Sequence, residues 1–192
     1  MSKLELWIPL KPANASQGFG NPHPMYTALG LKGHNGIDYY ATDGQIIRAS
    51  HKGVVTFAGE DGSAGLGIVI RTLEQFDYNG QMCYYKTIYW HLQQNSFLVK
   101  PGDIVQIGQP IARADNTGMS TGTHLHFGLK PLYQGEQDWE WWNVEQENGY
   151  KGSIDPAPYL LNYYAEDEVK VTATLTMLLS LLKQVWQLLL QR

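Results

Sequence analysis

The sequence predicts a mainly β, antiparallel domain followed by a C-terminal α-helix, and three observations support that expectation. Short runs of β-branched and aromatic residues alternate with turn residues from Lys3 to about Leu161. Glycine is abundant (20 of 192 residues) and 12% of the residues are aromatic, which suits short strands joined by tight turns. From Val169 onward glycine and proline are absent, and leucines recur at helical spacing instead.

Seven runs in the first part of the chain are expected to be strands. They are residues 46–50, 54–58, 67–71, 83–90, 103–105, 109–112 and 124–130. The runs 103–105 and 109–112 are expected to form a hairpin around Gly108, and the last run is expected to end at Pro131 because proline cannot donate to a strand ladder. A lipoyl- or biotinyl-type carrier would need a lysine at that hairpin tip, and the turn has none.

Residues 134–152 differ from the strands because they are acidic and carry Trp139, Trp141 and Trp142. The composition predicts a long loop or hairpin. Its tryptophans have two interpretations, as a wall of a substrate groove or as an aromatic cluster that packs the segment onto the core.

The chain divides into residues 1–165, a compact β domain, and residues 166–192, a leucine-rich amphipathic helix. The apolar positions of the helix fall at i, i+3, i+4 and i+7 and are Leu175, Leu178, Leu179, Leu182, Val185, Trp186 and Leu189. An apolar face this wide is expected to be buried against another surface. Docking on its own domain, self-association, a partner protein and a membrane surface are the alternatives, and the lack of a basic polar face weakens the last.

Composition and sequence pattern argue against several classes of protein and of site. The net charge of −4 argues against a nucleic-acid partner, which usually meets a basic face. Cys83 is the single cysteine, so internal disulfide frameworks, four-thiolate zinc sites and Cys-x-x-Cys redox motifs are excluded. Cys83 itself is expected to be a buried, small apolar residue. The N-terminus shows no signal peptide, so we expect cytoplasmic synthesis, and no apolar run reaches transmembrane length.

Histidines carry the chemical signal. His124 and His126 lie two apart in an expected strand, so their side chains share one face, ~6.6 Å apart. His34 and Asp38 would be ~13 Å apart in a straight strand, too far to share one ion, and Gly36 offers the bend that would bring them together. Histidine plus aspartate suits zinc. Each piece alone is more often a surface pair or a satisfied core group. A helical His-Glu-x-x-His site and the cupin pattern are both absent.

Six ordered blocks together resemble the lysostaphin/LytM-type zinc endopeptidases that cut peptidoglycan cross-links. The blocks are residues 33–38, 53–59, 89–92, 102–112, 117–127 and 154–160. The resemblance implies a β domain with a narrow groove walled by loops. It also implies Zn²⁺ on His34, Asp38 and His126. It places two further catalytic histidines at His91 and His124. Trp90 and Thr123 depart from the residues that are common in the family.

The resemblance implies hydrolysis of amide bonds in peptidoglycan stem peptides or cross-bridges by a zinc-activated water, with His91 or His124 as general base. The alternative is a catalytically silent wall-binding or hydrolase-activating module of the same fold. The substrate partner would be peptidoglycan, and the site of action the cell wall. A phage-encoded lysin, a released or unusually exported bacterial enzyme and a toxin delivered to rival cells all fit this expectation.

Other polar residues near these motifs have weaker interpretations. His51 is expected to be solvent-exposed in a turn before Gly53, and His23 is a candidate for substrate contact. Three hydroxyl residues precede the His124–His126 pair, and they either orient imidazoles or serve as plain turn residues. They are Thr117, Ser120 and Thr123.

Overall fold

The computed structural model of the chain describes residues 2–135, 140–161 and 164. Its strands are β1 (Ala15–Gln17), β2 (Ile37–Tyr40), β3 (Ile46–Arg48), β4 (Gly53–Glu60), β5 (Leu66–Thr72), β6 (Phe76–Tyr78), β7 (Gln81–Trp90), β8 (Ile104–Val105), β9 (Pro110–Arg113), β10 (His124–Gln134) and β11 (Trp141–Asn143). Its helical segments are α1 (Pro24–Ala28), η1 (Gly62–Ala64) and η2 (Ala157–Tyr159).

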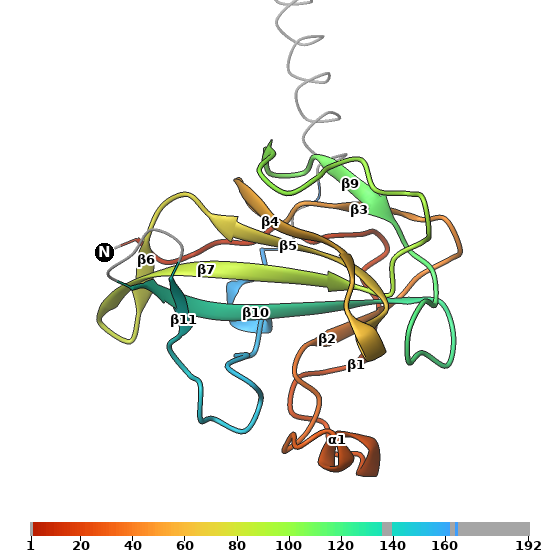
Figure 1. Cartoon of the computed structure of the whole chain (residues 1–192), viewed down its shortest axis with the longest axis horizontal. Helices are drawn as coiled ribbons and strands as arrows, with labels where there is room; N and C mark the ends of the chain where they lie inside the picture. The colour runs from red at the N-terminus through yellow and green to blue at the C-terminus, as the bar shows by residue number, and fades with distance from the viewer. Residues whose placement is uncertain (1, 136–139, 162–163, 165–192) are drawn as a thin grey trace, which may run out of the picture.

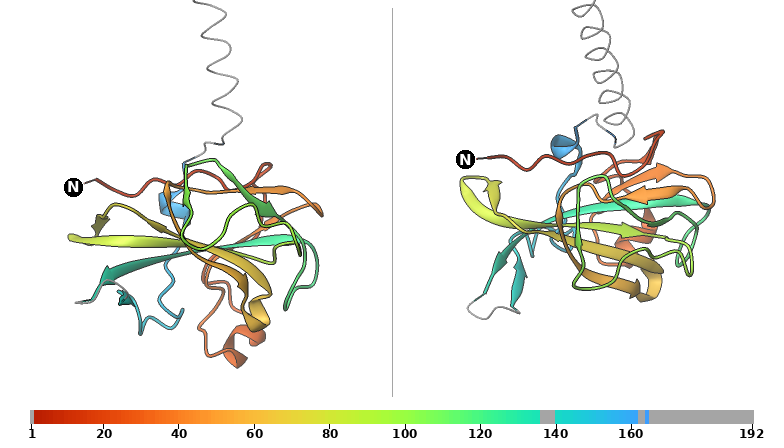
Figure 2. Two further views of the ribbon diagram at one scale, coloured as in Figure 1. Left: turned by 45° about the horizontal axis from the view of Figure 1, so that its top comes forward. Right: turned by 90° about the horizontal axis from the view of Figure 1, so that it is seen from above.

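A large antiparallel sheet dominates the described residues, which confirms the mainly β, antiparallel part of the predicted fold class. Its strand order is β1-β2-β10-β7-β5-β4-β8, with β11 added to β10 and β6 added to β7. Strands β3 and β9 form a separate two-stranded sheet that lies on one side of the large one, whereas α1 lies on the other side (Figure 1). The two turned views show how strongly the large sheet twists (Figure 2).

Strand β10 has two chemically different faces. Leu125, Phe127 and Leu129 point to one side and are fully buried in the core. His124, His126 and Lys130 occupy the alternate positions and face a groove. Because a one-residue slip would exchange these two sets, burial of the apolar set fixes the register that aims the histidines.

The core lies between the large sheet, the β3–β9 pair and the N-terminal segment. Its largest fully buried side chains are Tyr85, Tyr89, Phe127, Leu4, Leu6, Leu10, Ile47, Ile68, Ile70, Leu92, Ile111 and Leu125. Cys83 is a free, buried thiol in this core, as predicted, and burial raises its pKa. This packing holds the groove-facing strands rigidly from behind.

The expected hairpin around Gly108 is wrong. Strand β8 pairs with β4 through Gly53 and Val105, whereas β9 pairs with β3 in the smaller sheet. The turn closes locally, since the Gln109 N–H donates to the Gln106 carbonyl (3.1 Å). Local turn residues therefore marked the turn correctly but could not specify that its two flanking strands join different sheets.

The expected end of the last strand at Pro131 is also wrong, because β10 continues to Gln134. The Pro131 carbonyl accepts from the Val144 N–H (3.0 Å), away from β7. The N–H and C=O of one strand residue point to the same side of the strand. Position 131 therefore directs both groups away from β7, and the absence of an N–H in Pro131 removes no hydrogen bond between β7 and β10.

The segment with tryptophans is a hairpin, since β11 pairs with β10. Trp141 packs against Tyr84, and the Arg71 guanidinium lies 3.7 Å from its ring centroid. Trp142 is 48% exposed. Neither ring lines the groove, so packing is the correct interpretation for Trp141, whereas Trp139 lies outside the described residues.

The predicted leucine-rich helix of residues 166–192, and with it the division of the chain at residue 165, lies outside the described residues. Within the described part of the chain, no helix has the length and apolar character needed to cross a membrane.

Candidate metal centre and its groove

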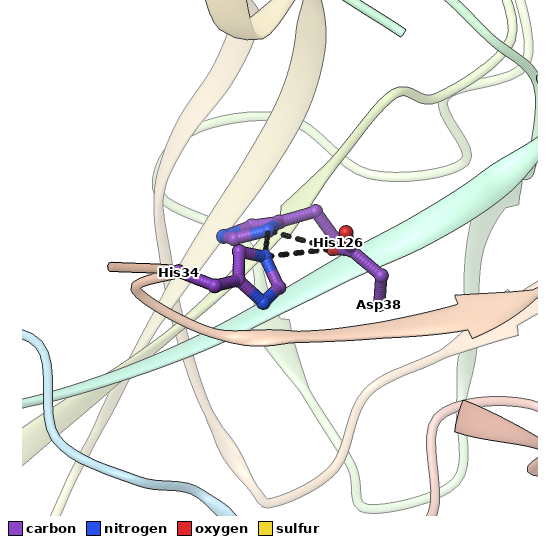
Figure 3. Close-up of side chains that lie close together, drawn as sticks. All are labelled: His34, Asp38 and His126. Carbon is purple, nitrogen blue, oxygen red and sulfur yellow. Dashed lines mark hydrogen bonds and ion pairs between the residues drawn. The ribbon is translucent and has the colours of Figure 1, made fainter. Parts of the chain in front are cut away.

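Three side chains from distant parts of the chain meet at one point (Figure 3). Asp38 Oδ1 lies 3.0 Å from His34 Nε2 and 2.9 Å from His126 Nδ1. The two imidazole nitrogens are themselves 3.0 Å apart. The structure therefore brings together the three residues that the sequence nominated as metal ligands.

Strand pairing explains this convergence. Asp38 in β2 stands directly opposite His126 in β10, so both side chains leave the same face of the sheet. His34 lies in the bend before β2 begins at Ile37. The predicted bend is present, but Gly36 is needed for space. A Cβ on Gly36 would lie 2.7 Å from Cε1 of the His126 ring.

The donor set fits a divalent metal. His34 Nδ1 lies 3.1 Å from the Gly18 carbonyl, which can only accept, so this nitrogen carries the proton. In the neutral ring, the Nε2 lone pair then points at the Asp38 oxygen 3.0 Å away. A cation held between two such lone pairs removes their repulsion, and two imidazoles plus a carboxylate are the ligand types that zinc prefers.

Burial and mutual contact set the charge of the centre. Burial by itself raises the pKa of the Asp38 carboxyl, but contacts with His126 and His34 outweigh it and hold that pKa well below its ordinary value. Burial lowers the pKa of His126. At neutral pH the centre thus offers a carboxylate and a neutral imidazole, the protonation states that metal binding requires.

Two further histidines lie beside the centre. The rings of His91 and His124 are 4.4 Å apart, centroid to centroid, and His124 Nε2 is 3.8 Å from Asp38 Oδ2. His91 follows the last residue of β7 and adopts a φ of 64°, a left-handed conformation that is uncommon for a residue other than glycine. Such conformations concentrate at functional sites.

Backbone carbonyls orient both of these rings. His91 Nδ1 donates to the Thr117 carbonyl (2.7 Å), and His124 Nδ1 donates to the Gly122 carbonyl (2.8 Å). Each ring then keeps Nε2 as its unprotonated nitrogen when neutral. Burial lowers the pKa of His91 to about 4, so the His91 imidazole is neutral at pH 7.

The hydroxyl residues before β10 divide into two groups. Thr117 orients His91 through its carbonyl, and Ser120 Oγ lies 3.2 Å from His124 Nδ1. Thr117 Oγ1 also donates to the Leu92 carbonyl, which ties its loop to the end of β7. The structure gives Thr123 no such contact with an imidazole.

The five nominated residues open into one groove of about 710 Å³. Three segments outside the sheet form its walls: residues 25–31 at α1, residues 61–64 at η1 and residues 118–121. A groove of this size can enclose an extended peptide, which a flat surface cannot do. The loop-walled groove expected from the sequence is therefore present.

Two other histidines do not join the site. His51 was expected in solvent, but it is buried, with Nε2 2.9 Å from Thr87 Oγ1 and Nδ1 2.9 Å from the Lys52 carbonyl. The neighbouring Gly53 indicated a turn, and a turn residue is usually exposed, so the sequence did not predict the burial of His51. His23 caps α1 by accepting from the Met25 N–H (3.2 Å) and is not among the groove residues.

Sequence reasoning missed Tyr26, whose ring stacks on His34 with centroids 5.4 Å apart. Its hydroxyl donates to Gln17 Oε1 (2.7 Å), and burial raises its pKa to about 12, so Tyr26 stays neutral. A five-residue helix carries too little periodicity to reveal this contact from the sequence.

Comparison with known proteins agrees with this geometry. The family model described as peptidase family M23 matches residues 32–138, which include all five nominated residues. The DD-carboxypeptidase/endopeptidase Mpg of Neisseria meningitidis is 38% identical over 120 residues, 62% of this chain and 25% of Mpg. The peptidoglycan DD-endopeptidase ShyC of Vibrio cholerae is 36% identical over 128 residues, 66% of this chain and 27% of ShyC. The chain thus spans about a quarter of the length of these curated relatives.

Solved structures give the same result for the fold. The catalytic domain of lysostaphin from Staphylococcus simulans superposes with a TM-score of 0.56 at 27% identity, covering 77% of this chain and 91% of that domain. A zinc-containing peptidase from Vibrio cholerae gives a TM-score of 0.53 at 29% identity, covering 70% of this chain and 37% of that one. Since the family model matches more than half of its residues, the chain belongs to peptidase family M23.

Proposed function

We propose that this chain is a zinc-dependent endopeptidase that hydrolyses amide bonds in the peptide part of peptidoglycan. The observation that carries the proposal is the arrangement of five side chains. His34, Asp38 and His126 supply three converging donor atoms, and two further imidazoles face the same groove. The relative named peptidoglycan DD-endopeptidase ShyC supports the substrate class.

In this proposal His34, Asp38 and His126 hold the metal. When bound there, zinc supplies Lewis-acid activation of a water nucleophile and of the scissile carbonyl. Three protein donors converge here, which is the number found in catalytic rather than structural zinc sites.

His91 and His124 move the protons. One imidazole accepts the proton of the attacking water at its unprotonated Nε2. The other, in its protonated form, donates from Nε2 to the oxyanion of the tetrahedral intermediate or to the leaving amine. Their Nδ1 atoms are held by the Thr117 and Gly122 carbonyls, so both rings present Nε2 to the groove without further rearrangement. The walls around residues 61–64 and 118–121 hold the peptide over these rings.

The test compares His126→Ala with His124→Ala and His91→Ala, measuring bound zinc by mass spectrometry and hydrolysis of purified peptidoglycan. His126→Ala is expected to lose both zinc and hydrolysis. The other two variants are expected to keep stoichiometric zinc while hydrolysis falls ~100-fold or more. Full hydrolysis by His126→Ala would contradict the ligand assignment. Wild-type protein that binds the wall and releases no fragments would instead identify a silent binding module.

We further propose that the protein acts on the cell wall, outside the compartment of its synthesis. Purified protein added to intact cells tests this, and release of soluble wall peptides is the expected result.

A further inference from the structure

The groove floor continues beyond the metal centre along β7 and β10. The register pairs His126 with Trp90, then Gly128 with Ile88, then Lys130 with Lys86. These alternate positions all face the groove, and each except Gly128 lines it. At ~3.3 Å per residue, the lysine pair lies ~13 Å along the strand from His126.

Three lysines gather at this end of the groove. Lys86 and Lys130 are half-buried and stand directly opposite each other, and the ammonium of Lys130 donates to the Lys151 carbonyl (2.7 Å). Lys151 also lines the groove, and it lies in a turn between β11 and η2. Like charges directly opposite each other destabilise a sheet, so the pairing of Lys86 with Lys130 lowers the stability of the protein.

The charges of this cluster are not neutralised within the described residues. Lys86 and Lys130 form no ion pair with any of them, and Asp61 in the wall is the carboxylate whose charge acts on Lys130. Burial, with the nearby charges of Lys86 and Lys151, lowers the pKa of Lys130 to about 8 despite Asp61. Burial also lowers the pKa of Lys86. An anion placed between these ammonium groups would offset both the burial and the repulsion.

We propose that Lys86, Lys130 and Lys151 form an anion subsite that binds a free carboxylate of the peptide substrate. The subsite deepens the proposed function and rests on it, because it selects among the peptides of peptidoglycan. An extended peptide advances ~3.3–3.6 Å per residue, so the ~13 Å from His126 to the lysine pair corresponds to about four residues. The bound carboxylate therefore belongs to a residue about four positions from the scissile bond.

The subsite assigns a substrate class. Stem peptides that carry free carboxylates would engage the lysines, whereas a glycine bridge offers no side-chain carboxylate to them. Lys86, Lys130 and Lys151 are therefore specificity-determining residues, remote from bond cleavage, and they are expected to act on the choice of substrate rather than on the protons transferred.

The experiment uses two synthetic cross-linked stem-peptide dimers that differ only in whether their carboxyl groups are free or amidated, plus a pentaglycine peptide. For each probe, kcat/KM is measured by chromatography and binding by fluorescence anisotropy. The variants are Lys86→Gln and Lys130→Gln, and the matched control is Lys100→Gln, an exposed lysine that does not line the groove. Circular dichroism verifies that each variant is folded.

Wild-type protein and Lys100→Gln are expected to prefer the free-carboxylate dimer. Each groove variant is expected to lose about tenfold of that preference, as a charge-assisted contact is lost, while cleavage of the amidated dimer stays unchanged. Cleavage of both dimers at equal rates by wild-type protein would overturn the subsite and leave the endopeptidase proposal standing. Lysine-dependent binding preference without cleavage of any probe would support the subsite and overturn the proposed function. Preferences that persist in both groove variants would overturn the subsite as well.

Discussion

Asp38 and His126 face each other across the β2–β10 pair, and their side chains meet with Asp38 Oδ1 2.9 Å from His126 Nδ1. One register therefore sets two things at once. It buries Ile37, Tyr39, Leu125 and Phe127 on the core face, and it brings two of the three donors together on the groove face. The hydrophobic free energy of that apolar set thus helps to preorganise the metal centre.

Gly36→Ala is expected to weaken the metal centre without unfolding the protein. The added Cβ would lie 2.6 Å from the Phe127 carbonyl oxygen and 2.8 Å from His126 Nε2, so both the local backbone and the His126 ring must move. Displacing a ligand in this way should cost about 10- to 100-fold in zinc affinity.

Competition against a zinc-selective chelator measures that affinity. Gly59→Ala is the control, because its Cβ would meet only the Phe57 ring at ordinary contact distance (3.5 Å). Unchanged zinc affinity in Gly36→Ala would contradict the role assigned to this glycine.

Removal of the metal is expected to stop hydrolysis and lower thermal stability. Without a cation, the His34 Nε2 lone pair faces the Asp38 carboxylate at 3.0 Å inside a buried site. A metal that binds the folded state alone stabilises it by ~3 kcal/mol at a hundredfold excess over its dissociation constant.

Differential scanning calorimetry of chelator-treated protein, with and without added zinc, tests this expectation. The wild-type melting temperature should rise on zinc addition, and that of His126→Ala should not. An equal rise in both proteins would place the metal elsewhere.

The sequence predicted the site better than it predicted the sheet. Single histidines and aspartates carried little weight, but six ordered blocks that resemble the family implied His34, Asp38 and His126 as ligands without knowledge of any strand pairing. The bend at Gly36 was also expected, although the reason differs, since the glycine leaves room for the His126 ring.

The pairing partner of each strand and the burial of single residues could not be predicted from local sequence motifs. The turn at Gly108 has the residues of a hairpin, yet its flanking strands join separate sheets, because pairing depends on long-range packing. His51 was expected in solvent from its neighbour Gly53, yet it is buried against Thr87 from another strand. The sequence alone does not distinguish Lys86 and Lys130 from other charged strand residues, and only the strand register shows that they stand opposite each other in the groove.

His51 is expected to make stability depend on pH. Burial lowers its pKa to about 4 in the folded protein, against ~6.5 when unfolded, so the unfolded state binds more protons between these values. Stability is therefore complete above about pH 6.5 and falls as pH drops toward 4, by about 2 kcal/mol at pH 5.

Urea unfolding of wild-type protein and His51→Gln at pH 7.5 and pH 5 separates this contribution from that of the other histidines. The wild-type protein should lose about 2 kcal/mol more than the variant between the two pH values. An identical loss in both proteins would show that His51 does not titrate in this range.

Gly67→Ala is expected to disturb the floor beside the metal centre through Trp90. A Cβ on Gly67 would overlap the Trp90 ring at Cε3. That ring packs edge-on against Phe57 with centroids 5.8 Å apart. Trp90 can occupy the groove floor because position 67 has no side chain. The substitution should destabilise the protein by about 1–3 kcal/mol, the usual cost of overpacking, and should raise KM by displacing the ring.

A double-mutant cycle decides whether Trp90 is the cause. In a Trp90→Ala background, Gly67→Ala should cost much less, because the ring that it would strike is gone, giving a coupling energy of about 1 kcal/mol or more. Urea unfolding measures stability and peptide hydrolysis measures KM for all four proteins. Additive effects would mean that the backbone conformation, rather than the Trp90 ring, requires glycine at position 67. Trp90 would then not be the residue that shapes this part of the groove.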